Sequence, residues 1–421
     1  MRTAREGAPR RQPAREPAAR TYARALPVVP VRARGLTIEG ADGRRYLDCV
    51  SGAGTLALGH NHPVVLEAIR RVLDSGAPLQ VTDLTTPVED AFVTELLRTL
   101  PTGLADHARV RFCGPSGADP VAHAVALVRA ATGRTRVIAS TDARPGTTDA
   151  DHGAASVLED LRPGEEPPAG LILEPVRSED GVLPAPDDWV RRMRSSTAAR
   201  AVPLIVDETG TGVGRTGAYW AVEHSGVTPD VLVLSGAIGG SLPLAAIVHR
   251  DDLYDRDAPR AGEPGAGAFR GNQLALAAGA ATLAHVREHR LAEHAAALGG
   301  RMLTRLRSLA GEFACVGEVR GRGLMAGVEL VAPDDGPDDR AHGARSGPCA
   351  ELAAAVRREC LRRGLIVDVT GPRANVVRLL PPLIVTEEQM SAVLDRLADA
   401  VQAVDRRPGD PAGLREDRAP R

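Results

Sequence analysis

Short, solidly apolar runs rich in β-branched residues recur through the central third of the chain, and this pattern constrains the fold more than any other feature. The runs lie at residues 110–112, 137–138, 171–173, 204–206, 231–234 and 246–248. Helix-sized stretches separate several of these runs, and their apolar character is typical of strands covered on both faces. Because strands that alternate with helices usually build a parallel sheet, the pattern predicts an α/β domain with a mostly parallel sheet.

The length of 421 residues exceeds what one compact core usually contains, since chains beyond ~250–300 residues tend to divide into domains. We expect residues 86–300 to form a large domain, and residues 26–85 and 301–405 to form a smaller α+β domain together. Residues 1–25 and 406–421 are basic and rich in proline, so they are predicted to be disordered tails.

The composition argues against several classes of protein. Fifty-two basic and 54 acidic side chains give a formal charge of −2, so no bulk charge favours a nucleic-acid or membrane partner. No apolar run approaches the ~18–20 residues that a membrane span needs. The cysteines are odd in number and scattered; they are Cys49, Cys113, Cys315, Cys349 and Cys360. We therefore expect a cytoplasmic protein without a disulfide scaffold.

The most consequential count is that of lysine. No lysine occurs anywhere in the chain, so all 52 basic residues are arginines. Chemistry that needs a lysine amine is therefore excluded for this polypeptide.

Two other candidate sites are set aside. His60 and His62 are flanked by turn residues, so no metal site is expected. Cys113 follows an apolar run and is expected to pack rather than to act as a nucleophile.

A glycine-containing turn follows the first predicted strand and precedes a predicted helix. It reads GPSGADP over residues 114–120. Glycine lets the backbone approach a ligand, and the start of a helix offers free N–H groups to an anion. A phosphate would therefore fit against Ser116, Gly117 and Ala118, although the same residues also suit a plain strand–helix turn.

Two carboxylates, Asp207 and Glu208, follow the run at 204–206, at the end of a strand where open α/β sheets place their ligands. A buried Asp needs a cationic partner, which a protonated pyridine nitrogen would supply, whereas an exposed one would only cap the strand. The glycines of 212–217 do not open a predicted helix, so they do not indicate a dinucleotide site.

Several strings together resemble the class III aminotransferases of pyridoxal 5'-phosphate (PLP) fold type I, over roughly residues 27–405. They are DETGTGVGRTG (207–217), GHNHP (59–63), FCGP (112–115), EP (174–175), FRGNQLA (269–275) and RLLPPL (378–383). Within that family, the strings FRGNQLA, LTTP (84–87) and GAGT (52–55) are most similar to diaminobutyrate–2-oxoglutarate aminotransferases.

The resemblance implies a large domain with a mostly parallel sheet, a smaller α+β domain built from both ends of the chain, and a homodimer. It also implies the cofactor PLP, amino acid and 2-oxo acid substrates, and roles for six residues. Ser116, Gly117 and Ala118 would contact the cofactor phosphate, Asp207 would pair with the pyridine nitrogen, Arg378 would receive a substrate carboxylate, and Glu179 would be the gate that pairs with Arg378. Without the family, Glu179 also suits a surface carboxylate, and Arg378 also suits a structural ion pair.

The chain departs from the family at the cofactor. Gly236 occupies the place of the lysine that forms the Schiff base, and glycine has no side chain to replace it. Gly210 replaces a glutamine that contacts the cofactor's phenolic oxygen, and Ala268 replaces a threonine that reaches the phosphate across the dimer interface. Between 138 and 174 the chain is shorter than the family pattern, and Asp151 stands where a ring-stacking aromatic residue is usual.

These losses predict a catalytically silent homologue, a pseudoenzyme that forms a homodimer or a heterodimer with an active, lysine-bearing paralogue. Two alternatives stay open. One is an enzyme that binds PLP or pyridoxamine phosphate without covalent attachment and works without an internal aldimine. The other is a decayed transaminase with no present role.

Overall fold

A computed structural model describes residues 26–81, 84–115, 118–139, 165–253, 270–332 and 347–405. Its largest sheet has six strands in the order β4-β11-β10-β9-β6-β5. They are β4 (Ala108–Cys113), β11 (Ala245–Arg250), β10 (Val231–Ser235), β9 (Leu204–Asp207), β6 (Gly170–Leu173) and β5 (Val137–Ala139). The strands β10, β9, β6 and β5 pair in parallel, while β11 runs antiparallel to β10 and β4. The mostly parallel α/β sheet predicted from the apolar runs is confirmed.

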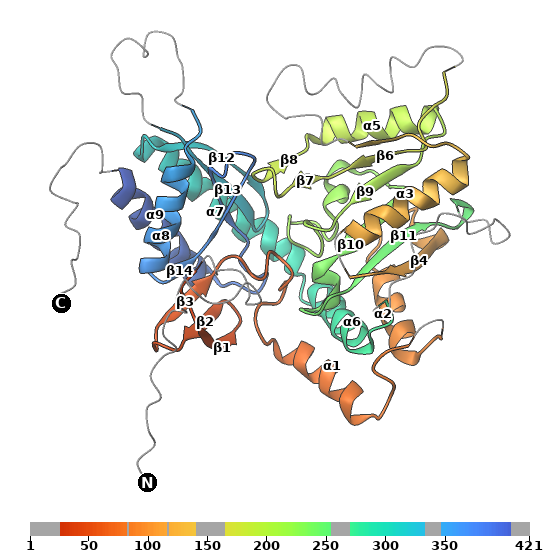
Figure 1. Ribbon diagram of the computed structural model, residues 1–421, viewed down its shortest axis with the longest axis horizontal. Helices are drawn as coiled ribbons and strands as arrows, with labels where there is room; N and C mark the ends of the chain where they lie inside the picture. The colour runs from red at the N-terminus through yellow and green to blue at the C-terminus, as the bar shows by residue number, and fades with distance from the viewer. Residues whose placement is uncertain are drawn as a thin grey trace, which may run out of the picture.

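Helices cover both faces of this sheet (Figure 1). On one face, α3 packs against buried side chains such as Ile205, Val231 and Val233. On the other face, α2, α5 and α6 share the larger core with residues such as Leu204 and Val206. The helices are α2 (Pro87–Leu97), α3 (Ala118–Thr132), α5 (Asp187–Ala199) and α6 (Gln273–Glu288). Because neighbouring residues of a strand point to opposite faces, each strand contributes to both cores, which is why the runs are apolar throughout.

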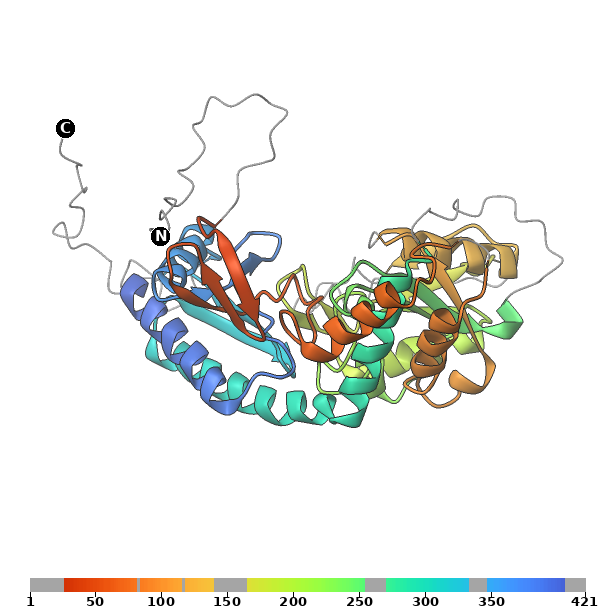
Figure 2. The same ribbon diagram turned by 90° about the horizontal axis from the view of Figure 1, so that it is seen from below.

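The two ends of the described chain build a second region. Strands β1 to β3 form a sheet to which β14 adds in parallel, and β12, β13, β16 and β15 form an antiparallel sheet. These strands are β1 (Pro30–Arg34), β2 (Thr37–Gly40), β3 (Arg45–Asp48), β12 (Val316–Arg322), β13 (Met325–Leu330), β14 (Leu365–Ile366), β15 (Asp368–Thr370) and β16 (Val376–Leu379). Figures 1 and 2 show this region at the end of the molecule away from the six-stranded sheet.

The described structure also has four further α-helices, several short 3-10 helices, and the short pair β7 (Val176–Arg177) and β8 (Leu183–Pro184). The α-helices are α1 (Pro63–Asp74), α7 (Leu291–Glu312), α8 (Ala350–Arg362) and α9 (Glu387–Asp405). In Figure 2, α7 extends from the region of α6 to the second region, where it lies near α9. Within the described ranges, no helix is both long and apolar enough to cross a bilayer.

Candidate active site

The carboxyl ends of β6, β9 and β10 meet at one edge of the large sheet. Glu174 follows β6, Asp207 ends β9, and Gly236 follows β10. The parallel register pairs Leu173 with Val206 and Val233 with Asp207, so these three chain positions come together at the same edge. Ligands of open α/β sheets bind outside such carboxyl ends, which makes this edge the candidate site.

Asp207 is a largely buried carboxylate at the centre of this edge. The Thr209 N–H donates a hydrogen bond to its Oδ1 over 2.9 Å. Burial raises the pKa of Asp207, and the hydrogen bonds from Thr209 oppose that rise. Within the described ranges no arginine forms an ion pair with it. The carboxylate is therefore complementary to a cation that the described residues do not supply.

Glu174 makes the same edge still more acidic. Its pKa is raised to about 7, first by burial and then by the neighbouring charges of Asp207, Asp180 and Glu179, whereas Arg177 opposes the rise. A carboxyl group with such a pKa can hold or release a proton near neutral pH. Sequence reasoning did not assign it a role, although its place directly after a buried strand was the available signal.

Glu208 has a different task from Asp207, although the sequence presents the two carboxylates as a pair. It is 1% exposed, and its Oε1 accepts a hydrogen bond from the Val222 N–H over 2.8 Å. Its other oxygen accepts a hydrogen bond from the Thr211 hydroxyl. Burial raises the pKa of Glu208 to about 7. This side chain therefore fastens the loop after β9 rather than facing a ligand.

Gly236 directly follows β10, which ends at Ser235, and begins the short 3-10 helix η4 (Gly236–Gly239). Its φ is +68°, and its N–H donates to the Leu244 carbonyl over 3.2 Å. A Cβ atom added there would lie 3.1 Å from Thr55 Cγ2 and 3.8 Å from the Thr209 carbonyl oxygen. The position therefore faces both the loop that follows Asp207 and the N-terminal loop that contains Thr55. Its equivalence to the family lysine stays a prediction.

Arg378, on β16, lies at the other side of the candidate site. It is 3% exposed, and its Nη1 donates to the Glu179 carboxylate over 2.5 Å and to Ser178 Oγ over 2.9 Å. The structure thus brings together the two residues that the resemblance paired as gate and receiver. Nη2 is also engaged, because it lies 2.6 Å from Asp368 Oδ2 on β15. Sequence reasoning missed Asp368, since no strand was predicted at 368–370.

Gly210 joins these groups into one site. A Cβ atom added to Gly210 would lie 3.4 Å from Ser178 Cβ, so the loop after Asp207 contacts the segment that holds the Arg378 guanidinium. This distance is an ordinary van der Waals contact, so the packing of the loop would also accommodate a Cβ atom at residue 210. The expected loss of a glutamine contact at this position remains a prediction.

The phosphate side of the predicted site lies largely outside the described residues. Ser116, Gly117, Ala268 and Asp151 are not described, and for Ala118 the structure gives only the start of α3. The predicted strand–turn–helix order around them is present, because β4 ends at Cys113 and α3 begins at Ala118. The roles of these residues as phosphate contacts therefore stay predictions.

The two candidates that were set aside take other partners. His60 Nε2 lies 2.8 Å from Asp48 Oδ2, and the His62 ring packs on that of His285. No group of three or more His, Cys, Asp or Glu side chains in the described part of the chain is arranged to hold a metal. Cys113 is 1% exposed, and burial raises its pKa to about 12, so its thiol stays protonated.

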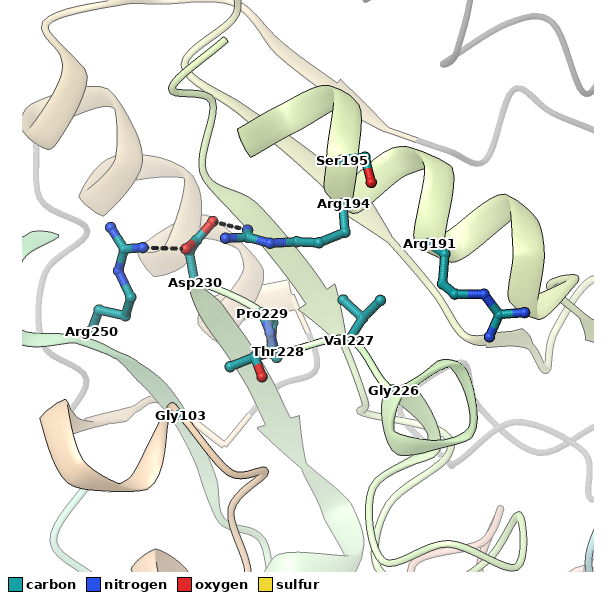
Figure 3. Close-up of a pocket in the computed structure, with 10 residues that line it drawn as sticks. All are labelled: Gly103, Arg191, Arg194, Ser195, Gly226, Val227, Thr228, Pro229, Asp230 and Arg250. Atoms are coloured by element: carbon teal, nitrogen blue, oxygen red, sulfur yellow. Dashed lines mark hydrogen bonds and ion pairs between the residues drawn. The ribbon is translucent and has the colours of Figure 1, made fainter. Parts of the chain in front are cut away.

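A cavity of about 510 Å³ lies at the opposite, amino end of β10, lined by three arginines (Figure 3). Figure 3 shows Asp230 between Arg194 and Arg250. Its Oδ2 lies 2.6 Å from Arg194 Nη1, and its Oδ1 lies 2.8 Å from Arg250 Nη1. The Leu204 N–H donates to the same carboxylate, which is 4% exposed. Arg191, the third arginine, donates to the Ser225 carbonyl. These guanidinium groups are thus already engaged in an ion-pair and hydrogen-bond network, and the cavity is not the candidate site.

Comparison with known proteins identifies the family. The chain matches the family Aminotransferase class-III over residues 18–156 and 147–401. It therefore belongs to the class III aminotransferases, and the family fold implies dependence on PLP. Within the family, the chain is 41% identical to the diaminobutyrate–2-oxoglutarate aminotransferase of Rhizobium meliloti (strain 1021), over 94% of this chain and 93% of that protein. The diaminobutyrate–2-oxoglutarate aminotransferase of Haemophilus influenzae is 37% identical, over 93% and 94%.

Solved structures agree on the fold. The structure of Plasmodium falciparum ornithine delta-aminotransferase aligns with a TM-score of 0.75 at 24% identity, over 93% of this chain and 97% of that one. A thermostable (S)-enantioselective omega-transaminase from Thermomicrobium roseum aligns with a TM-score of 0.76 at 26% identity, over 90% and 93%. The architecture is therefore PLP fold type I, as the sequence strings predicted.

Proposed function

We propose that this class III aminotransferase is a pseudoenzyme that does not transfer amino groups on its own. The observation that carries the proposal is the absence of lysine from the whole chain, with Gly236 at the carboxyl end of β10. In covalent catalysis of this kind, a lysine amine attaches to the carbonyl carbon of the cofactor. Glycine can form no such bond, and no other residue of this chain carries a side-chain amine.

The residues of the site support non-covalent binding of PLP or pyridoxamine phosphate. Asp207 is a partly buried carboxylate that lacks a cationic partner in the described structure, which suits a protonated pyridine nitrogen. When bound, the cofactor supplies an electron sink for a substrate carbanion. We assign the phosphate contacts to Ser116, Gly117 and Ala118 and place Gly210 and Ala268 at positions where family contacts are lost.

The substrates of the site follow from the family, as amino acids and 2-oxo acids. We propose that Arg378 receives a carboxylate when the exposed Glu179 side chain releases it. We further propose a dimer, either of this chain alone or with a lysine-bearing paralogue whose activity it modulates.

The free cysteines favour a reducing compartment, and we propose that the protein lies in the cytoplasm. They are Cys49, Cys113, Cys315, Cys349 and Cys360.

Spectroscopic titration tests the proposal. The purified chain is titrated with PLP and with pyridoxamine phosphate, treated with borohydride, and assayed with diaminobutyrate and 2-oxoglutarate. The Rhizobium meliloti relative is the positive control. We expect saturable, dialysable cofactor absorbance, no borohydride-trapped side-chain adduct and no turnover. Because the N-terminus is the only primary amine of a lysine-free chain, peptide mapping shows whether any trapped cofactor is there. Steady turnover by the chain alone would refute the proposal.

Mixing with a lysine-bearing paralogue tests the dimer. Co-expression with differently tagged chains should give a mixed species whose specific activity differs from that of the paralogue alone. If the two chains never co-purify and the paralogue's rate is unchanged, the partner-subunit role is wrong.

A second candidate function is favoured by Glu174. A partly buried carboxyl group whose pKa is raised to about 7, beside Asp207, can move a proton without a lysine. In that case the protein would be an enzyme that uses pyridoxamine phosphate and a 2-oxo acid. A single-turnover assay, in which pyridoxamine phosphate is converted by 2-oxoglutarate, separates this candidate from the pseudoenzyme, and Glu174→Gln should abolish the conversion.

A further inference from the structure

Arg378 has two carboxylate partners, and the second of them is not a gate. Glu179 occupies Nη1 at 2.5 Å, and Asp368 occupies Nη2 at 2.6 Å. The guanidinium is almost fully buried at 3% exposure. One positive charge is therefore enclosed between two negative ones, and release of Glu179 alone leaves a neutral pair rather than a free cation.

The two carboxylates differ in their freedom to move. The Glu179 side chain is 80% exposed, on the loop between β7 and β8. The Asp368 side chain is 33% exposed, and its residue stands directly opposite Arg378 in the antiparallel β15–β16 pair. Asp368 Oδ1 also accepts a hydrogen bond from the Val369 N–H over 2.8 Å. Glu179 can thus leave the guanidinium by rotating its side chain, whereas Asp368 is fixed beside it by the sheet.

A cation and an anion fixed side by side form a dipole, and the ligand complementary to that dipole is a zwitterion. We infer that Arg378 and Asp368 together recognise the head group of an α-amino acid. The ligand's carboxylate replaces Glu179 at Nη1, near Ser178 Oγ, and its α-ammonium lies against Asp368. A carboxylate without an adjacent ammonium meets the charge of Asp368 uncompensated, so it binds less well.

This inference rests on the proposed function only in treating the edge of the sheet as an amino-acid site. It makes Asp368 a specificity-determining residue for ligands whose carboxylate stands beside an ammonium group. Binding alone tests it, so a failure of the pseudoenzyme proposal would leave it standing.

Isothermal titration calorimetry on the full chain provides the test. The probes are L-2,4-diaminobutyrate, which has the zwitterionic head group, and 2-oxoglutarate, which does not. Asp368→Asn should weaken diaminobutyrate at least tenfold and should leave 2-oxoglutarate unchanged or bound more tightly, because a competing negative charge is removed. Glu318→Gln is the matched control, since Glu318 lies 2.8 Å from Arg320 in the same sheet. That variant should change neither affinity.

Glu179→Gln provides a second variant in case Asp368→Asn does not fold, as judged by its thermal unfolding midpoint. Removing the competing carboxylate should tighten both ligands several-fold. The inference is overturned if Asp368→Asn weakens both probes by the same factor, since that would indicate a purely structural ion pair. It is also overturned if Glu179→Gln tightens neither ligand, or if the natural chain binds 2-oxoglutarate but not diaminobutyrate.

Discussion

Gly236 has a backbone conformation that glycine adopts freely and that other residues adopt at a cost. Its φ of +68° lies in the left-handed region, where an L side chain costs about 1–2 kcal/mol. The Thr55 methyl group, 3.1 Å from the position of an added Cβ, must also move. The local structure at residue 236 therefore suits glycine, and any longer side chain there requires the backbone conformation and the Thr55 side chain to adjust.

If Gly236 stands at the family's lysine position, as we propose, a lysine introduced there should still give no activity. We expect Gly236→Lys to lower the free energy of unfolding by about 1–2 kcal/mol and to give no steady transamination. Gly236→Ala isolates the backbone cost and should destabilise by a similar amount. Chemical denaturation and the coupled assay with 2-oxoglutarate measure the two effects. A lysine variant with the rate of the Rhizobium meliloti relative would show that the other departures from the family are harmless.

The free energy of unfolding should depend on pH in a way that reveals the raised pKa of Glu208. Its pKa is about 7 in the folded protein and 4.5 when unperturbed. Between these values the folded protein keeps a proton that the unfolded chain has lost, so stability falls as pH rises from about 4.5 to about 7. The full loss amounts to roughly 3 kcal/mol. Glu208→Gln should remove this part of the slope in denaturation curves, whereas Glu318→Gln should not.

At the scale of single elements, α7 contains two adjacent glycines, of which one has no room for a side chain and the other faces open space. A Cβ atom on Gly299 would lie 2.2 Å from the Gly323 carbonyl oxygen, in the turn between β12 and β13. A Cβ atom on Gly300 would meet nothing within 4 Å. The helix can approach the turn so closely only because residue 299 has no side chain.

Alanine substitutions in α7 should therefore change stability in opposite directions. Gly300→Ala should stabilise the protein by about 0.5–1 kcal/mol, because alanine is the better helix former. Gly299→Ala should destabilise it by about 1–3 kcal/mol, because backbone atoms must move apart. Denaturant titration of the two variants, each the other's control, measures the difference. Equal effects would mean that α7 does not pack on this turn.

At the scale of the whole molecule, Arg215 connects segments that are distant in the sequence. It is 2% exposed, and its guanidinium donates to the carbonyl groups of Gly54, Leu324 and Pro381. Burial lowers its pKa to about 10, so it remains charged at neutral pH. One side chain thus connects the loop after β9 to an N-terminal segment at Gly54 and to C-terminal segments at Leu324 and Pro381.

Removing this side chain should weaken the whole fold. We expect Arg215→Ala to lower the free energy of unfolding by about 3 kcal/mol or more, because it leaves buried carbonyl groups unpaired and opens a cavity. Arg307→Ala, an exposed position on α7, should change it by less than about 0.5 kcal/mol. Thermal unfolding followed by circular dichroism compares the two. A small effect at Arg215 would mean that solvent replaces its hydrogen bonds.

The sequence alone predicted the large sheet and those site residues that belong to a recognisable motif. The apolar runs predicted the parallel strands because strands buried on both faces have no polar side, and Asp207 was found because it ends such a run. Asp368 was not predicted, because its strand β15 has only three residues and gives no clear pattern. Its pairing with Arg378 depends on the register between β15 and β16, which the sequence does not reveal. The separate tasks of Asp207 and Glu208 were also hidden, because Glu208 is distinguished by its hydrogen bonds to Thr211 and Val222, which come together only when the loop after β9 folds.

Glu179 combines a tethered main chain with a free carboxylate. The Thr370 hydroxyl and the Gly371 N–H both donate to its carbonyl oxygen, at 2.6 and 2.9 Å. Uncovering the Nη1 of Arg378 therefore requires torsions within one side chain, which reorient in picoseconds to nanoseconds, and no loop has to rearrange over microseconds or longer. Capture of a small solute should accordingly follow simple second-order kinetics, with an observed rate that rises linearly with concentration and shows no slow isomerisation plateau.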